Sequence, residues 1–507
     1  MIVPRRSLLP RRSLLGAVLL LTGCGGAPPA IDTSTPVPPV GEGSRPSGDT
    51  VVPPSIGRAA VEALAFEPLD FEQPAVATRS VRGVDVLVLE DHALPLVTVY
   101  AYFRGGYGLF DRAHYAAAMG LPALLRYGGT ESLSPEQVDE ILDFHALQFS
   151  FGTAGGSVTT SVNTLSEHLE TAFDLWGDVL ANPAFAEREI ATWRARQAES
   201  VHRRMDEPGL LAFSEFNRLL YGDHPIGWEM DESDLAEERL APEQFRIVHR
   251  RIVCRENLVL GLTGGVAWRD AEPLVARLVD RVPPCPGDLP EPPIPEIRRG
   301  GGVFLIEREL DQAVIVMAHP TSVRLADDDE YYAAMIGNAI LGAGGFSSRL
   351  VGRVRTEEGY AYSAASLWTT PSRYDGIVGA TTRTRPENVV PAIEAILETM
   401  GELREAPPSA DEVDTTVEGI VNGFVFNFDT PGQIVSRTMY YMQQDLPDDW
   451  LERYWEGVRR VTPDGVLEVF REHLRLDEMT ILVVGDPARI GRDALATLGP
   501  VVVLDPR

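Results

Sequence analysis

The sequence predicts an α+β fold made of two homologous domains, each a mainly antiparallel sheet with helices packed on one face. Two sets of landmarks recur at a near-constant offset. The glycines that close two apolar segments, Gly264 and Gly485, stand 221 residues apart (485 − 264), and Pro208 and Pro431 stand 223 apart (431 − 208). A repeat of about 220 residues indicates that the body of the chain is a duplication.

Strands are expected in matching pairs at the start of each domain. Residues 84–90 and 95–101 in the first domain, and residues 303–307 and 313–317 in the second, are β-rich and separated by short turn segments. Such runs are typical of strands. The two glycine-closed segments supply one later strand to each sheet.

Helices are expected between these strands. A capping box of Ser134 and Gln137 opens a helix over residues 134–147. Residues 165–182 carry large apolar side chains at helical spacing and end at a proline, and residues 186–206 are charged and amphipathic. Each domain therefore combines a sheet with several helices.

The N-terminal residues form a targeting segment that precedes the fold. A stretch with four Arg residues leads into a short apolar run, residues 14–21, which is too short to span a bilayer comfortably. The run ends in Leu21-Thr22-Gly23-Cys24, which resembles the lipobox of bacterial lipoproteins and implies a lipid on Cys24 that anchors the chain to a membrane. A simple cleaved signal peptide with an unrelated Cys24 is the alternative.

Composition sets the remaining boundaries. After the 1–24 signal peptide, residues 25–73 are rich in Pro, Gly and Ser and form a tether. Residues 74–282 form the first domain, residues 283–302 a Pro- and Gly-rich linker, and residues 303–507 the second domain.

The charge balance and the cysteine count exclude several classes of protein. The 507 residues carry a formal net charge of −29, which disfavours nucleic acid as a partner because phosphate binding needs clustered basic side chains. Three cysteines exclude a disulfide-built scaffold and any Cys-rich zinc module. Cys254 and Cys285 either pair in an oxidising compartment, or Cys254 remains a buried free thiol.

Several motifs, in order and at the right spacing, carry a family resemblance. The most specific ones lie in the second domain, at residues 341–350 and 354–363. Weaker matches precede them at residues 104–106, 128–130, 182–185 and 220–225. Over about residues 74–507 the chain resembles the pitrilysin/insulinase family of zinc metallopeptidases, which includes the mitochondrial processing peptidase.

The resemblance also shows what is missing. Active members carry His-x-x-Glu-His on a first-domain helix, where two His bind Zn²⁺ and the Glu activates water. Here Gly120 and Leu124 stand at the two His positions, Ala123 at the base and Ser200 at the distal ligand. None of the nine His residues of the chain forms such a pair, and each is interpreted as a surface or packing residue. The sequence therefore predicts no metal and no catalytic residue in this chain.

One functional pair of the family is retained. Active relatives hold substrate with a second-domain Arg and a Tyr seven residues later, and Arg355 and Tyr362 have that spacing (362 − 355 = 7). The Arg offers donors to a peptide carbonyl, and the Tyr hydroxyl can donate to an oxygen that gains charge. The alternative is that Arg355 pairs with Glu357 or Glu358 and that Tyr362 only packs.

The resemblance therefore implies the non-catalytic, substrate-binding subunit of a heterodimeric zinc peptidase. Zinc is expected in a partner subunit of the same family, with a peptide substrate bound at a sheet edge. The lipid on Cys24 would hold the subunit at the bacterial cell envelope, facing the periplasm. The alternative is a structural scaffold or peptide-binding protein of the same fold, and an independently active peptidase is disfavoured by the absent ligands.

Overall fold

The structure, a computed structural model, describes residues 75–289 and 291–506. The predicted signal peptide, the lipid-bearing Cys24 and the tether lie outside the described residues. All described residues fall within one compact unit. Within this part of the chain, no helix combines the length and apolar character needed to cross a bilayer.

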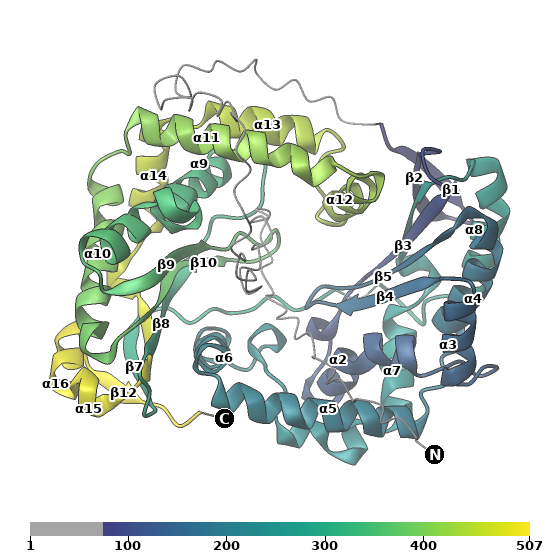
Figure 1. Cartoon of the computed structure of the whole chain (residues 1–507), viewed down its shortest axis with the longest axis horizontal. Coiled ribbons are helices and arrows are strands. Elements are labelled where there is room, and N and C mark those ends of the chain that lie inside the picture. Colours follow the sequence, from purple (N-terminus) through teal and green to yellow (C-terminus); the bar gives the residue numbers. More distant parts are fainter. Residues whose placement is uncertain (1–74, 290, 507) are drawn as a thin grey trace, which may run out of the picture. The chain divides into compact units, whose positions relative to one another are not determined.

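A six-stranded mixed sheet forms the first half of the described chain (Figure 1). The strand order is β1-β2-β6-β3-β5-β4, with β2 and β6 parallel and the other neighbours antiparallel. The strands are β1 Ala77–Val81, β2 Val84–Glu90, β3 Leu96–Arg104, β4 Gln148–Thr153, β5 Ser157–Leu165 and β6 Leu258–Gly264.

A second six-stranded sheet repeats this arrangement in the order β12-β7-β11-β8-β10-β9. The parallel pair β7 and β11 repeats the pair β2 and β6. Only the outermost strand differs, because β1 runs antiparallel to β2 whereas β12 runs parallel to β7. The strands are β7 Gly302–Glu307, β8 Ala313–Thr321, β9 Ala361–Trp368, β10 Gly376–Thr384, β11 Thr480–Gly485 and β12 Val501–Val503. The predicted duplication is therefore visible in the sheet topology.

Each sheet is covered on one face by helices of its own half. In the first half these are α2 Arg112–Tyr127, α3 Pro135–Phe144, α4 Leu169–Ala181, α5 Glu187–Asp206, α7 Pro242–Ile252 and α8 Trp268–Arg281. In the second half they include α9 Asp329–Asn338, α10 Val389–Glu405 and α14 Pro463–His473. The predicted fold class, sheets with helices packed on one face, is confirmed, although both sheets contain parallel as well as antiparallel pairs.

Local signals set where these helices begin. The capping box is present, since Ser134 Oγ accepts from the amide of Gln137 and the Gln137 side chain accepts from the amide of Ser134. The helix predicted over residues 165–182 begins only at Leu169, because β5 extends to Leu165 and a single 3₁₀ turn follows it.

The two halves exchange one helix each. The helix α6 Pro208–Tyr221 belongs in sequence to the first half, yet Leu211 and Phe216 share an apolar cluster with Val316 of β8 and Leu482 of β11. In Figure 1 it lies beside β8 of the second sheet. Helix α6 therefore completes the core of the other half.

The reciprocal helix is α12 Pro431–Gln443, which packs against β2, β3 and β6 of the first sheet. Its Val435 and Met439 cluster with Leu87. A Cβ at Gly261 of β6 would lie 2.5 Å from the Met439 sulfur, so only glycine permits this close approach. The paired prolines that indicated the repeat, Pro208 and Pro431, are the first residues of these two exchanged helices.

A disulfide resolves the alternatives left open for two cysteines. Cys254 and Cys285 are bonded, with their Cα atoms 4.8 Å apart. Cys254 is fully buried before β6, and the bond fastens the start of the segment that connects the two sheets. Disulfides persist mainly in oxidising compartments.

The remaining helices lie in the second half. They are α11 Ala410–Phe424, α13 Trp450–Arg460, and the short α15 Pro487–Ile490 and α16 Arg492–Leu495. An aromatic group of Tyr332, Trp450 and Tyr454 joins α13 to α9.

Candidate functional site

Helix α2 carries the three motif positions of the first domain. It begins at the N-cap Asp111, whose side chain accepts from the amide of His114, and it ends before Gly128. Gly120 and Leu124 are buried, and Ala123 is partly buried against the same core. The three positions therefore belong to the hydrophobic core of the first half.

Aromatic side chains fill the space beside α2. A Cβ added at Gly120 would lie 3.0 Å from Phe245 of α7 and 3.0 Å from two ring atoms of Trp193 of α5. The rings of Trp193 and Phe245 meet edge to face at 6.4 Å, and Phe185 stacks on Phe245 at 5.7 Å. A histidine at position 120 would collide with this aromatic cluster, which we define as Phe185, Trp193 and Phe245.

A buried histidine packs against the aromatic cluster but is not placed to replace a lost ligand. The His249 ring lies 5.7 Å from the ring of Phe185, and its Nε2–H donates to the carbonyl of Leu180 at 2.9 Å. Burial lowers the pKa of His249 from 6.5 to about 4. It is therefore a neutral packing residue at neutral pH, as the sequence analysis interpreted it.

The distal position offers no ligand either. Ser200 lies exposed on α5, and its neighbour Glu199 is exposed and 3.8 Å from Arg203. A hydroxyl, a methyl group, a Leu side chain and a glycine do not make a zinc site. The residues at positions 120, 123, 124 and 200 therefore do not provide the ligands for the zinc ion that active relatives bind with these positions.

The second predicted pair has a different setting. Arg355 lies in the helical segment Val351–Glu357, and its guanidinium carbon stands 4.7 Å from the ring centroid of Tyr362. The same guanidinium carbon also stands 4.9 Å from the ring centroid of Phe346. The rings are exposed, Tyr362 by 78% and Phe346 by 81%. We call these three residues the arginine stack.

The backbone presents Tyr362 away from the sheet. Tyr362 belongs to β9, an edge strand that pairs only with β10. Ala361 pairs with Thr384 and Ser363 pairs with Arg383, so Tyr362 is the extra residue of a β-bulge. Bulges at sheet edges re-aim a side chain, and they are frequent beside functional sites.

The alternative pairing of Arg355 with its acidic neighbours is not seen. Glu357 and Glu358 both pair with Arg353. Among the described residues no carboxylate is in ion-pair distance of Arg355, and its guanidinium contacts the rings of Phe346 and Tyr362. The structure thus brings Arg355 and Tyr362 together, with the Tyr362 ring largely exposed.

Sequence reasoning missed Phe346. The residue follows Gly344 and Gly345 in a short turn, and Gly345 has φ +73°, a conformation that favours glycine. An aromatic residue directly after two glycines, within the most specific family motif, was the available signal.

Comparisons with known proteins agree with these features. A family model described as the peptidase M16 inactive domain matches residues 239–420. A Streptomyces coelicolor protein named as an uncharacterized zinc protease is 24% identical over 359 residues, covering 69% of this chain and 76% of that protein. The non-peptidase homolog YmxG of Helicobacter pylori is 18% identical over 403 residues, covering 80% and 92%. The chain is thus similar to M16 peptidases, and residues 239–420 match their inactive domain.

Solved structures show the same fold. A peptidase M16 inactive domain from Pseudomonas fluorescens superposes with a TM-score of 0.71 at 24% identity, covering 81% of this chain and 98% of that one. The periplasmic protease PqqL of Escherichia coli superposes with a TM-score of 0.68 at 13% identity, covering 84% of this chain and 49% of PqqL. The predicted resemblance to the pitrilysin/insulinase peptidases is confirmed, and this M16 homologue lacks the residues that active relatives use to bind zinc.

Proposed function

We propose that this chain is the non-catalytic, substrate-binding subunit of a heterodimeric zinc metallopeptidase. The observation that carries the proposal is the contrast between the filled space beside Gly120 and the exposed arginine stack. Arg355 and Tyr362 can hold a peptide backbone, whereas Gly120, Ala123, Leu124 and Ser200 provide no zinc ligand and no general base at the motif positions. Zinc chemistry then belongs to a partner subunit with His-x-x-Glu-His.

The sheet edges suit a peptide substrate. Strands β4 and β9 each have one neighbour, so their outer edges can accept an extended peptide as an added strand. Because Tyr362 lies on β9, a peptide on that edge would run past the arginine stack. Arg355 would donate to a peptide carbonyl, and the Tyr362 hydroxyl would donate to the carbonyl oxygen as it gains charge at the partner's metal.

The proposed location is the periplasmic face of a bacterial membrane, with a lipid on Cys24 as anchor. Support comes from the lipobox-like residues 21–24, from the Cys254–Cys285 disulfide and from the fold shared with periplasmic PqqL. Replacement of Cys24 by Ser should release the protein from the membrane fraction. A Cys24→Ser chain that still fractionates with membranes would contradict the lipid anchor.

The test uses the full chain copurified with a zinc-bearing M16 protein of the same bacterium. We expect Arg355→Ala to weaken substrate binding by about 1.5–3 kcal/mol, the value of a charge-assisted hydrogen bond. We expect Tyr362→Phe to lower kcat by roughly 10²–10³, the cost of one oxyanion donor. Peptide cleavage by the reconstituted pair measures both effects, and assembly and partner zinc should not change.

The chain offers a matched control for this experiment. Arg459 of α13, an exposed residue, lies 4.7 Å from the ring centroid of the half-buried Trp455, in a cation–π contact of the same kind. Arg459→Ala should leave cleavage unchanged. If the Arg355 and Tyr362 variants also cleave at the unchanged kcat/KM, the substrate-binding role is wrong and the scaffold alternative takes its place.

A further inference from the structure

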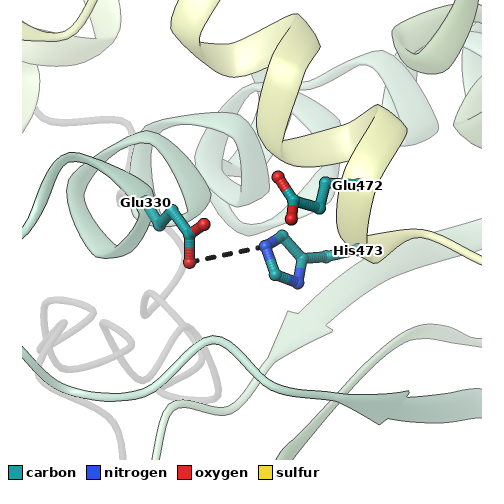
Figure 2. A group of neighbouring side chains, drawn as sticks. All are labelled: Glu330, Glu472 and His473. Atoms are coloured by element: carbon teal, nitrogen blue, oxygen red, sulfur yellow. Dashed lines mark ion pairs between the residues drawn. The ribbon is translucent and has the colours of Figure 1, made fainter.

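Three side chains that could bind a metal meet on the helices behind the second sheet. Figure 2 shows Glu330 of α9 facing Glu472 and His473 at the end of α14. One ligand atom from each residue lies within 4.8 Å of the other two. Helices α9 and α14 pack against one another, so the fold itself brings the three groups together.

His473 is the distinctive member of this group. It is 91% buried, and its Nε2 atom, which has no hydrogen-bond partner, points at the Glu330 carboxylate, as Figure 2 shows. The two atoms are 3.5 Å apart. A buried nitrogen without a hydrogen bond is costly, because it has lost its water and gained no partner.

The other ring nitrogen of His473, Nδ1, has a hydrogen-bond partner. Nδ1 lies 3.3 Å from the hydroxyl oxygen of Ser322, just after β8. When Nδ1–H donates to that oxygen, Nε2 carries the lone pair, which is the form that binds metals. A ligating histidine is commonly oriented by such a second hydrogen bond.

The distance between His473 Nε2 and the Glu330 carboxylate suits a shared metal better than a direct hydrogen bond. An N–H donor would sit about 2.9 Å from a carboxylate oxygen. Two ligand atoms of a tetrahedral Zn²⁺ site, each about 2.1 Å from the ion, stand about 3.4 Å apart. The Nε2–carboxylate distance of 3.5 Å matches that spacing.

The electrostatic setting favours a cation. Two carboxylates converge on one nitrogen at the C-terminal end of α14, where the helix dipole attracts positive charge. Among the described residues no Arg pairs with Glu330 or Glu472. The nearby Arg471 donates instead to the carbonyls of Arg404 and Glu405. The side chains of Glu330 and Glu472 are exposed, so they can close on an ion without moving the backbone.

We propose that Glu330, Glu472 and His473 form a binding site for a divalent transition metal ion such as Zn²⁺, which ties α9 to α14. One nitrogen and two oxygen ligands leave a coordination position for water. The site lies in the second half of the chain, apart from the degenerate motif on α2, and it does not depend on the proposed function. The sequence search missed it because its ligands are 142 residues apart (472 − 330) and lack a His pair.

Titration of the untagged, metal-free full chain with Zn²⁺ tests the proposal by calorimetry. We expect one ion per chain, and at least roughly tenfold weaker binding in Glu330→Gln/Glu472→Gln and in His473→Gln. Zn²⁺ should also raise the Tm of the native chain and not that of the variants. Co²⁺ should give the intense visible bands of a tetrahedral site.

The control is another close pair of potential ligands, His145 and His168, whose Nδ1 atoms are 3.4 Å apart. His168→Gln should leave zinc binding unchanged. Absence of stoichiometric binding, or binding that survives the Glu330/Glu472 double variant, overturns the proposal. Because both glutamates are exposed, that variant remains informative even if His473→Gln does not fold.

Discussion

The interior beside α2 and the arginine stack contain the two sets of positions that the family resemblance assigns to one active site, yet their surroundings are opposite. Beside α2 the ligand positions have become core, and Trp193 and Phe245 occupy the space where a ligand side chain would project. At the stack, the rings of Phe346 and Tyr362 are largely exposed and the half-buried Arg355 contacts both. Exposed large side chains are typical of binding surfaces, whereas the filled space beside α2 leaves no room for a metal ligand.

The largest effect on stability is expected when the His-x-x-Glu-His motif is restored on α2. Gly120→His/Ala123→Glu/Leu124→His forces a ring into the aromatic cluster and buries polar groups, so we expect a loss of stability on the order of 5 kcal/mol. Urea unfolding measures it. Elemental analysis should find no zinc beyond that of the native chain. A stable variant that takes up an additional zinc ion would show that the site is only dormant.

The pH dependence of stability sharpens the same contrast. The pKa of His249 is 6.5 when exposed and about 4 in the fold, so the unfolded chain binds more protons between these values. This contribution to stability is complete above pH 6.5 and is lost as the pH falls toward 4, by ~3 kcal/mol. Unfolding of the native chain and of His249→Gln at several pH values isolates it, because Gln removes the titration. Parallel pH curves would contradict the assignment.

A single methyl group gives a finer test. Gly120→Ala places its Cβ 3.0 Å from two buried rings, and we expect a cost of about 1–3 kcal/mol that outweighs the better helix propensity. The matched change is Gly419→Ala, at a position of α11 where nothing lies within 4 Å of the new Cβ. It should stabilise the chain by about 0.5–1 kcal/mol. If Gly120→Ala and Gly419→Ala changed the Tm equally, the rings of Trp193 and Phe245 would be free to move away from the new methyl group.

The smallest effect on stability is expected at the arginine stack. Arg355→Ala removes two exposed cation–π contacts, each worth about 0.5–1 kcal/mol at most in solvent. Part of this is offset because an ordered side chain regains its freedom. Denaturant unfolding should therefore shift by less than about 1 kcal/mol. A larger loss would show that the stack is a structural element.

The sequence predicted what local patterns and repeats encode. The offsets of Gly264 and Pro208 from their counterparts indicated the duplication, and the family resemblance singled out Arg355 and Tyr362, which lie in contact in the structure. Phe346 was missed because its exposure depends on a turn that brings it to the far side of Arg355. The aromatic cluster was missed because its rings come from three separate segments, and only their packing shows that the space is filled.

Two features depended on distances that no sequence pattern gives. Whether Cys254 pairs with Cys285 depends on a Cα separation of 4.8 Å. The group of Glu330, Glu472 and His473 depends on the packing of two helices that are distant in sequence. Long-range packing of this kind is decided by the whole fold.

The helix exchange has a consequence for how the chain is made. When synthesis has passed residue 282, α6 is complete, but β8 and β11, which cover Leu211 and Phe216, have not yet been translated. The face of the first sheet that contains Leu87 likewise stays uncovered until Val435 and Met439 of α12 have been translated. Until both partners of each contact are translated, the apolar side chains of α6 and of the first sheet stay exposed to solvent. A prematurely terminated chain would therefore present an aggregation-prone apolar surface. The two halves therefore bury these apolar faces only after both have been translated.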